Sequence, residues 1–120
     1  MGFTFKIIFD GARLSYKHIT TTELNARLKR GDKLSLIDVR EPIEFEIARI
    51  EGADLLPMSR LNEWIGLLHS DEEIVVICHH GIRSAQVCSY LVQMGFEKIY
   101  NLTGGIDAWS SEVDSSVPRY

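Results

Sequence analysis

A cysteine precedes two histidines, a glycine and an arginine in the segment Cys-His-His-Gly-Ile-Arg-Ser, residues 78–84. The β-branched apolar run 74–77 comes before it, and a helical pattern begins near Arg83 or Ser84. The first N–H groups of a helix and its dipole favour an anion, and a thiolate is an anion. We therefore expect Cys78 to be a nucleophile whose pKa is lowered by this position.

The residues that follow Cys78 suit such a loop. Gly81 allows a tight turn with positive φ, so that successive backbone amides can converge on the sulfur. Arg83 adds a fixed positive charge, or holds the loop through an acidic neighbour. A cysteine that only ends a buried strand, which is a common role, does not need a polar loop beside it. The sequence therefore favours a reactive thiol over a structural one.

Zinc binding is a second interpretation of the same residues. Suitable ligand atoms are present on Cys78, His79, His80 and Cys88, but these residues lack the spacing of zinc sites. Adjacent histidines tend to point apart. Cys88 falls on the apolar stripe of the predicted helix beside Val87, so we expect it in the core rather than as a ligand or a resolving thiol. We therefore expect no metal at this loop.

Phosphate chemistry is a third interpretation, because cysteine phosphatases also place an arginine at the end of a cysteine loop. Only four residues separate Cys78 from Arg83, one fewer than in those enzymes. The shorter loop would form a narrower cradle, which suits a single sulfur atom better than a tetrahedral phosphoryl group. Loop length therefore favours sulfur, and activity on an aryl phosphate would distinguish the two chemistries.

The elements that position this loop alternate along the chain. Short apolar segments with strand character alternate with amphipathic segments of helical periodicity. The predicted strands are residues 34–39, 52–57, 73–78 and 98–102, and the predicted helices are residues 20–30, 41–49, 59–68, 83–94 and 104–113. Such alternation predicts an α/β fold with a mainly parallel sheet and helices on both faces. Ligands of these sheets bind beyond the carboxyl ends of the strands, where Cys78 is expected.

The N-terminal residues follow a different pattern. Apolar residues occupy alternate positions from Phe3 to Phe9, as in a strand, and Asp10-Gly11 is a hairpin turn signal. Residues 12–19 would form the returning strand. We predict an N-terminal β-hairpin that caps the sheet or pairs with another chain.

Composition and charge narrow the classes of function. The 120 residues, 45% hydrophobic and 25% charged, suit one soluble domain, and no apolar run approaches the ~20 residues that cross a membrane. The net charge of -4 argues against a nucleic acid partner. The first thirty residues hold six Lys/Arg against two Asp/Glu, which indicates a solvated basic face or a dock for an acidic protein. Two cysteines and no signal-peptide pattern predict a reduced, cytoplasmic location.

Three motifs carry a resemblance to a known family. They are LIDVREPIEFEIARIEGADLLP at residues 36–57, CHHGIRS at residues 78–84 and NLTGGIDAW at residues 101–109. In their order and spacing they resemble the single-domain form of the rhodanese family of sulfurtransferases. The resemblance implies a rhodanese-like α/β fold with a central five-stranded sheet over residues 16–112. Residues 1–15 would be an N-terminal extension and residues 113–120 a C-terminal tail.

The resemblance also implies a mechanism. Cys78 would take sulfur from a small anionic donor such as thiosulfate, become a persulfide, and pass the sulfur to a thiol, to cyanide or to a sulfur-carrier protein. The persulfide would be held by the backbone amides of the loop residues His79, His80, Gly81, Ile82, Arg83 and Ser84, and Arg83 would help to attract the anionic donor. No metal and no organic cofactor are implied.

Three further residues are candidates for supporting roles. Asp38 ends the neighbouring strand and could accept hydrogen bonds from the loop backbone or cap a turn. Arg40 could pair with Asp38, Glu41 or Glu44, and we expect a surface ion pair. Arg49 stands where the family often has a histidine, so it is either solvated or part of a positive rim for anionic donors.

Other functions stay open on the sequence. The ending GGIDAWSSEVDSSVPRY, residues 104–120, resembles the C-terminal end of rhodanese domains fused to adenylating enzymes that activate sulfur-carrier proteins. An acidic carrier could then dock on the basic N-terminal third. The alternatives are a non-catalytic rhodanese-like binding module and a cysteine phosphatase or arsenate reductase on a related scaffold.

Overall fold

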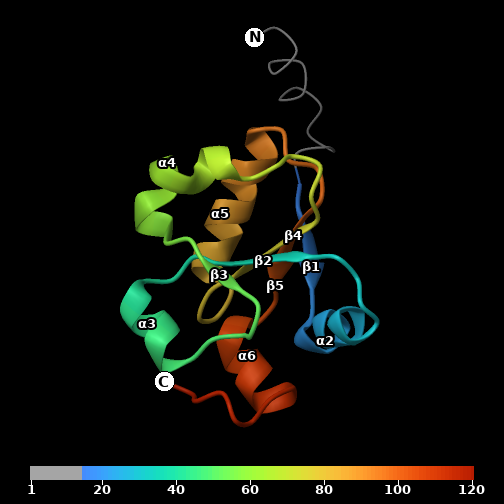
Figure 1. The fold of residues 1–120 in the computed structure, drawn as a ribbon, viewed down its shortest axis with the longest axis vertical. Helices are drawn as coiled ribbons and strands as arrows, with labels where there is room; N and C mark the ends of the chain where they lie inside the picture. Colours follow the sequence, from blue (N-terminus) through green and yellow to red (C-terminus); the bar gives the residue numbers. More distant parts are fainter. Residues whose placement is uncertain (1–14) are drawn as a thin grey trace, which may run out of the picture.

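Five parallel strands form one sheet in the computed structural model, which describes residues 15–120 (Figure 1). The strands are β1 (Lys17–Ile19), β2 (Ser35–Asp38), β3 (Asp54–Leu55), β4 (Ile74–Ile77) and β5 (Ile99–Leu102), in the spatial order β1-β5-β4-β2-β3. Each neighbouring pair is parallel. The predicted α/β fold with a five-stranded, mainly parallel sheet is confirmed. Most of the predicted N-terminal hairpin lies outside the described residues.

Helices connect the strands, as the alternation along the sequence predicts. They are α2 (Thr21–Lys29), α3 (Pro42–Ile47), α4 (Leu61–Trp64), α5 (Ile82–Gln93) and α6 (Gly105–Glu112), with 3₁₀ turns η2 (Met58–Arg60) and η3 (Ile65–Leu67) on either side of α4. The N-terminus of α2 is closed by a capping box, in which the Thr20 side chain and Glu23 satisfy each other's backbone N–H groups.

The single helix predicted over residues 59–68 is wrong in detail, because the structure divides it into η2, α4 and η3. Arg60, between η2 and α4, departs from helical geometry, with φ of −121° and ψ of 28°. The Trp64 side chain is buried, and its indole N–H donates to the Pro57 carbonyl over 2.7 Å. Packing of this one large side chain therefore overrides the helical periodicity of the segment.

Strand β4 lies at the centre of two hydrophobic layers. Successive side chains of a strand point to opposite faces, so Ile74 and Val76 pack on one side and Val75 and Ile77 on the other. The first layer includes Trp64 and the α5 residues Val87, Cys88 and Leu91, and the second includes Leu24 of α2 and Ile106 and Trp109 of α6. A strand buried on both faces explains the uninterrupted apolar run before Cys78.

The carboxyl ends of β2, β4 and β5 meet at one edge of the sheet. Asp38 is in register with Ile77, and the Val39 amide donates to the Ile77 carbonyl over 2.9 Å. Figure 1 places α3 and α6 near this edge, together with the C-terminal tail. Within residues 15–120, the helices are too short or too polar for any of them to cross a membrane.

Candidate active site

Cys78 follows β4 directly and is buried, with 1% of its surface exposed. The backbone N–H of Gly81 donates to Cys78 Sγ over 3.1 Å, and Ser84 Oγ lies 3.2 Å from the same sulfur. A thiol that only fills space does not need two polar partners. This sulfur therefore has the donors that a negative charge would need, although almost none of it is in contact with solvent.

The loop can turn back on the sulfur because of its glycine. Gly81 has φ of 102° and immediately precedes α5, as predicted. Its carbonyl accepts a hydrogen bond from Asn101 Nδ2 on β5 over 3.1 Å, which fixes the turn. A side chain at this position would strain the backbone and separate the Gly81 amide from Cys78.

Gly105 brings α6 against the loop. The Ile106 amide donates to the Cys78 carbonyl over 2.9 Å, and the Asp107 amide donates to the His79 carbonyl over 3.1 Å. A β-carbon on Gly105 would overlap both carbonyl oxygens. A glycine at this position therefore allows α6 to begin against the loop that follows Cys78.

Asn101 is a site residue that the sequence analysis missed. It is buried, and its Oδ1 accepts a hydrogen bond from Ser84 Oγ over 2.5 Å. A hydroxyl has one proton, so in this arrangement the Cys78 thiol donates to Ser84. When the thiol ionises, the Ser84 proton must turn from Asn101 to the sulfur. A polar side chain in an otherwise apolar strand is the signal that could have identified Asn101.

Arg83 holds the loop to α3. Its two terminal nitrogens donate to the two carboxylate oxygens of Glu44 over 2.7 and 2.9 Å. This bidentate pair lowers the pKa of Glu44 to about 2, and the carboxylate raises the pKa of Arg83. Of the two predicted roles for Arg83, the structure supports the clamp through an acidic neighbour.

Asp38 and Arg40 form a buried ion pair, so the predicted surface pair is wrong. Arg40 has no exposed surface, and its Nε and Nη2 donate to the Asp38 carboxylate over 2.9 and 2.7 Å. The remaining N–H groups reach the carbonyls of Glu44 and Ala48 and the hydroxyl of Tyr120. Burial is tolerated because the guanidinium finds acceptors on all sides. Asp38 holds Arg40, rather than the loop that follows Cys78.

Two other predicted residues have exposed side chains, and neither is among the described hydrogen-bond partners of the sulfur. The Ile82 side chain begins α5 and is 73% exposed, so it contributes to the outer surface of the loop. Arg49 is exposed and lies over the ring of Phe45, 4.9 Å from its centroid. A positive rim formed by Arg49 stays a prediction.

The C-terminal tail lies against the site. The Tyr120 ring stacks on His79 with centroids 4.0 Å apart, and its hydroxyl donates to Glu44 Oε2 over 3.0 Å. Arg119 pairs with Asp107 of α6 through two contacts of 3.0 Å. The tail is irregular, and its contact with the loop was not predicted.

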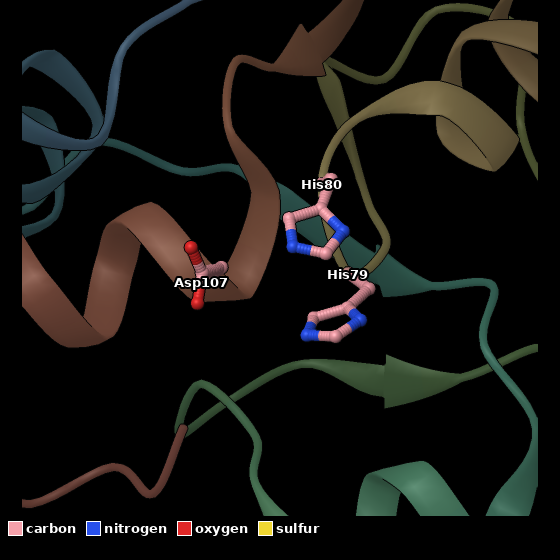
Figure 2. A group of neighbouring side chains, drawn as sticks. All are labelled: His79, His80 and Asp107. Atoms are coloured by element: carbon pink, nitrogen blue, oxygen red, sulfur yellow. The ribbon is translucent and has the colours of Figure 1, made fainter. Parts of the chain in front are cut away.

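His79 and His80 lie together, contrary to the expectation that adjacent histidines point apart. Their ring centroids are 3.9 Å apart, at an interplanar angle of 31° (Figure 2). Glycine at the next position lets the chain turn, so both side chains project from the same side of the loop. Burial and the nearby charge of His80 lower the pKa of His79.

Cys88 lies in the core, as predicted. It is buried on α5 among apolar side chains, and both cysteines are free thiols. Burial, with a smaller contribution from Cys78, raises the pKa of the Cys88 thiol to about 12. It is therefore protonated and inert at neutral pH.

Comparison with known proteins relates the chain to one family. The model of the rhodanese-like domain matches residues 20–112. The chain is 34% identical over 95 residues to the thiosulfate sulfurtransferase GlpE of Shewanella oneidensis, covering 79% of this chain and 93% of that protein. A crystal structure of a rhodanese-related protein from Thermoplasma volcanium superposes with a TM-score of 0.74 at 35% identity, covering 82% of this chain and 94% of the other.

Longer relatives contain a similar domain. The chain is 40% identical over 118 residues to the probable adenylyltransferase/sulfurtransferase MoeZ of Mycobacterium tuberculosis, covering 95% of this chain and 30% of that protein. It spans about a third of the length of the longer curated relatives that it matches. From the matched residues and the shared fold, this chain belongs to the rhodanese family.

Proposed function

We propose that the protein is a sulfurtransferase that moves sulfane sulfur from thiosulfate or a persulfide donor to a thiophilic acceptor through a persulfide on Cys78. The observation that carries the proposal is the pairing of Cys78 Sγ with the Gly81 amide and the Ser84 hydroxyl inside a short loop. Relatives named thiosulfate sulfurtransferase support the same class of reaction.

In the first step, the Cys78 thiolate attacks the outer sulfur of thiosulfate. The sulfur–sulfur bond of the donor breaks, its electron pair leaves on sulfite, and Cys78 becomes a persulfide. The Gly81 amide and the Ser84 hydroxyl then stabilise negative charge within the loop. Both groups already lie within hydrogen-bond distance of the sulfur, and the Ser84 proton must turn from Asn101 toward it.

In the second step, an acceptor thiolate attacks the terminal sulfur of the persulfide. The sulfur–sulfur bond of the persulfide breaks, the acceptor carries away the outer sulfur, and the Cys78 thiolate is restored. The persulfide is the form that extends toward the acceptor, since the Cys78 side chain itself is buried.

The contacts of Arg83 argue against phosphatase chemistry. A phosphate loop needs the guanidinium to face the phosphoryl oxygens, but both terminal nitrogens of Arg83 donate to Glu44. With only four residues between Cys78 and Arg83, the loop is also short for a phosphoryl group. Sulfur transfer uses this arrangement without breaking the ion pair.

Steady-state kinetics test the proposal. Purified protein should form thiocyanate from thiosulfate and cyanide, and Cys78→Ala should abolish the activity. Arylphosphatase activity should be absent. If the wild-type chain transfers no sulfur from thiosulfate or from a persulfide donor but retains its fold, the interpretation as a non-catalytic binding module replaces this one.

A further inference from the structure

Three side chains that could bind a metal ion lie close together at the loop. None of them is a hydrogen-bond partner of Cys78 Sγ. They are the imidazoles of His79 and His80 and the carboxylate of Asp107, and their ligand atoms all lie within 4.8 Å of one another. Figure 2 shows one nitrogen of each ring turned toward the side on which Asp107 lies. The sulfur chemistry described above uses none of these three side chains.

His79 carries a second, independent observation. In the part of the chain that the structure describes, its Nε2 is a buried side-chain nitrogen without a hydrogen-bond partner. A buried polar atom of this kind calls for an explanation, because desolvation without a partner costs free energy. The ring cannot turn easily to find a partner, since Tyr120 stacks on one face and His80 lies against the other.

We propose that His79, His80 and Asp107 form a binding site for a divalent first-row transition metal ion, with Zn²⁺ as the best match. Two imidazole nitrogens and one carboxylate oxygen are a ligand set that zinc accepts, and a fourth position would stay open.

The site needs a modest rearrangement to close around an ion. Bond lengths of about 2.0–2.2 Å place three ligand atoms roughly 3–4 Å apart, which is closer than the 4.8 Å limit within which they now lie. His80 is exposed, and the 31° tilt between the rings already departs from parallel stacking. His79 would stay in place against Tyr120.

Arg119 competes with the ion. Its guanidinium pairs with both oxygens of Asp107, and the arginine side chain is 60% exposed. An exposed pair of this kind contributes little to stability, so an incoming cation can displace it. Removing the positive charge at residue 119 should therefore strengthen metal binding, a result that a merely structural role of the cluster would not produce.

Zn²⁺ titration by calorimetry tests the proposal on the full chain with Cys78→Ser, which removes the thiolate as a competing ligand. One ion should bind. Each of His79→Ala, His80→Ala and Asp107→Asn should weaken binding by about tenfold or more, since even an outer-shell partner has that effect. Arg119→Gln should strengthen it about two- to fivefold. Co²⁺ should show a ligand-field spectrum that His80→Ala loses.

His69→Ala is the matched control, because His69 is also exposed but lies outside the cluster. It should leave the affinity unchanged. Absence of saturable Zn²⁺ binding would overturn the proposal, as would equal weakening by His69→Ala and His80→Ala. The titration does not depend on sulfur transfer, so either proposal can fail without the other.

Discussion

Cys78 and Cys88 are both buried, yet their surroundings prepare them for different chemistry. Cys78 Sγ has an amide and a hydroxyl as partners, whereas Cys88 lies among apolar side chains of the core. The difference follows from their positions, one at the end of a strand and the other on the inner face of a helix. Burial alone therefore does not separate a reactive thiol from a structural one.

Selective modification tests this difference between the thiols. Iodoacetamide at neutral pH should label Cys78 and leave Cys88 unlabelled, because the pKa of Cys88 is raised to about 12. Cys88→Ala should retain sulfur transfer, with stability lowered by the small cavity that it leaves. Peptide mapping after labelling gives the site, and loss of transfer in folded Cys88→Ala would show that Cys88 takes part.

Ser84 should stabilise the charged sulfur. Ser84→Ala removes a hydroxyl 3.2 Å from Cys78 Sγ and should slow persulfide formation about ten- to a hundredfold, the usual effect of a hydrogen bond to a charged group. Ser89→Ala, on the exposed face of the same helix, is the matched control and should leave the rate unchanged. Stopped-flow reaction with thiosulfate measures both. Equal rates for the two variants would contradict this role.

At the scale of elements, α3 and α5 are joined across the loop by Glu44 and Arg83. Tyr120 of the tail also holds Glu44, since its hydroxyl donates to Glu44 and accepts from Arg40. The loop is therefore fixed from two sides, by β5 through Asn101 and by α3 through Glu44. We expect the position of the Gly81 amide to depend on both the Asn101 contact and the Glu44 contact.

The Glu44 attachment predicts a pH dependence of stability. The folded-state pKa of Glu44 is lowered from 4.5 to about 2, so its stabilising contribution is fully present above the unfolded value and is lost as pH falls from about 4.5 toward 2. Urea unfolding at pH values between 4.5 and about 2 measures this effect. The free energy of unfolding should fall less steeply with falling pH in Glu44→Gln than in the wild type. Glu46→Gln, exposed on the same helix, should behave like the wild type, and identical slopes for Glu44→Gln would refute the linkage.

At the scale of the whole molecule, the buried pair of Asp38 and Arg40 connects the sheet to α3 and the tail. Arg40→Ala leaves the Asp38 carboxylate buried without its partner and should lower the free energy of unfolding by about 3–5 kcal/mol. Arg49→Ala, nine positions further along the chain and exposed, should change the free energy of unfolding by less than about 0.5 kcal/mol. Urea unfolding compares them. A similar loss of unfolding free energy in both variants would mean that Arg40 does not connect the sheet to α3 and the tail.

Local patterns predicted much of the fold and the centre of the site. The alternation of strand and helix periodicities predicted the parallel sheet. The position of Cys78 between a strand and a glycine turn predicted the loop that surrounds the sulfur. The burial of Arg40 was not predicted, because arginine is ordinarily exposed and one of its acceptors, Tyr120, lies 80 residues away. The stacking of His79 on Tyr120 was missed for the same reason, since contacts between distant segments leave no periodic signal.

Intact mass after treatment with thiosulfate tests the central claim most directly. The full chain should gain one sulfur atom, the gain should map to the peptide that contains Cys78, and dithiothreitol should reverse it. Cys78→Ala should gain none, while Cys88→Ala should behave like the wild type. A folded wild-type chain that stays at its original mass with thiosulfate and with a persulfide donor would contradict a sulfur-carrying Cys78.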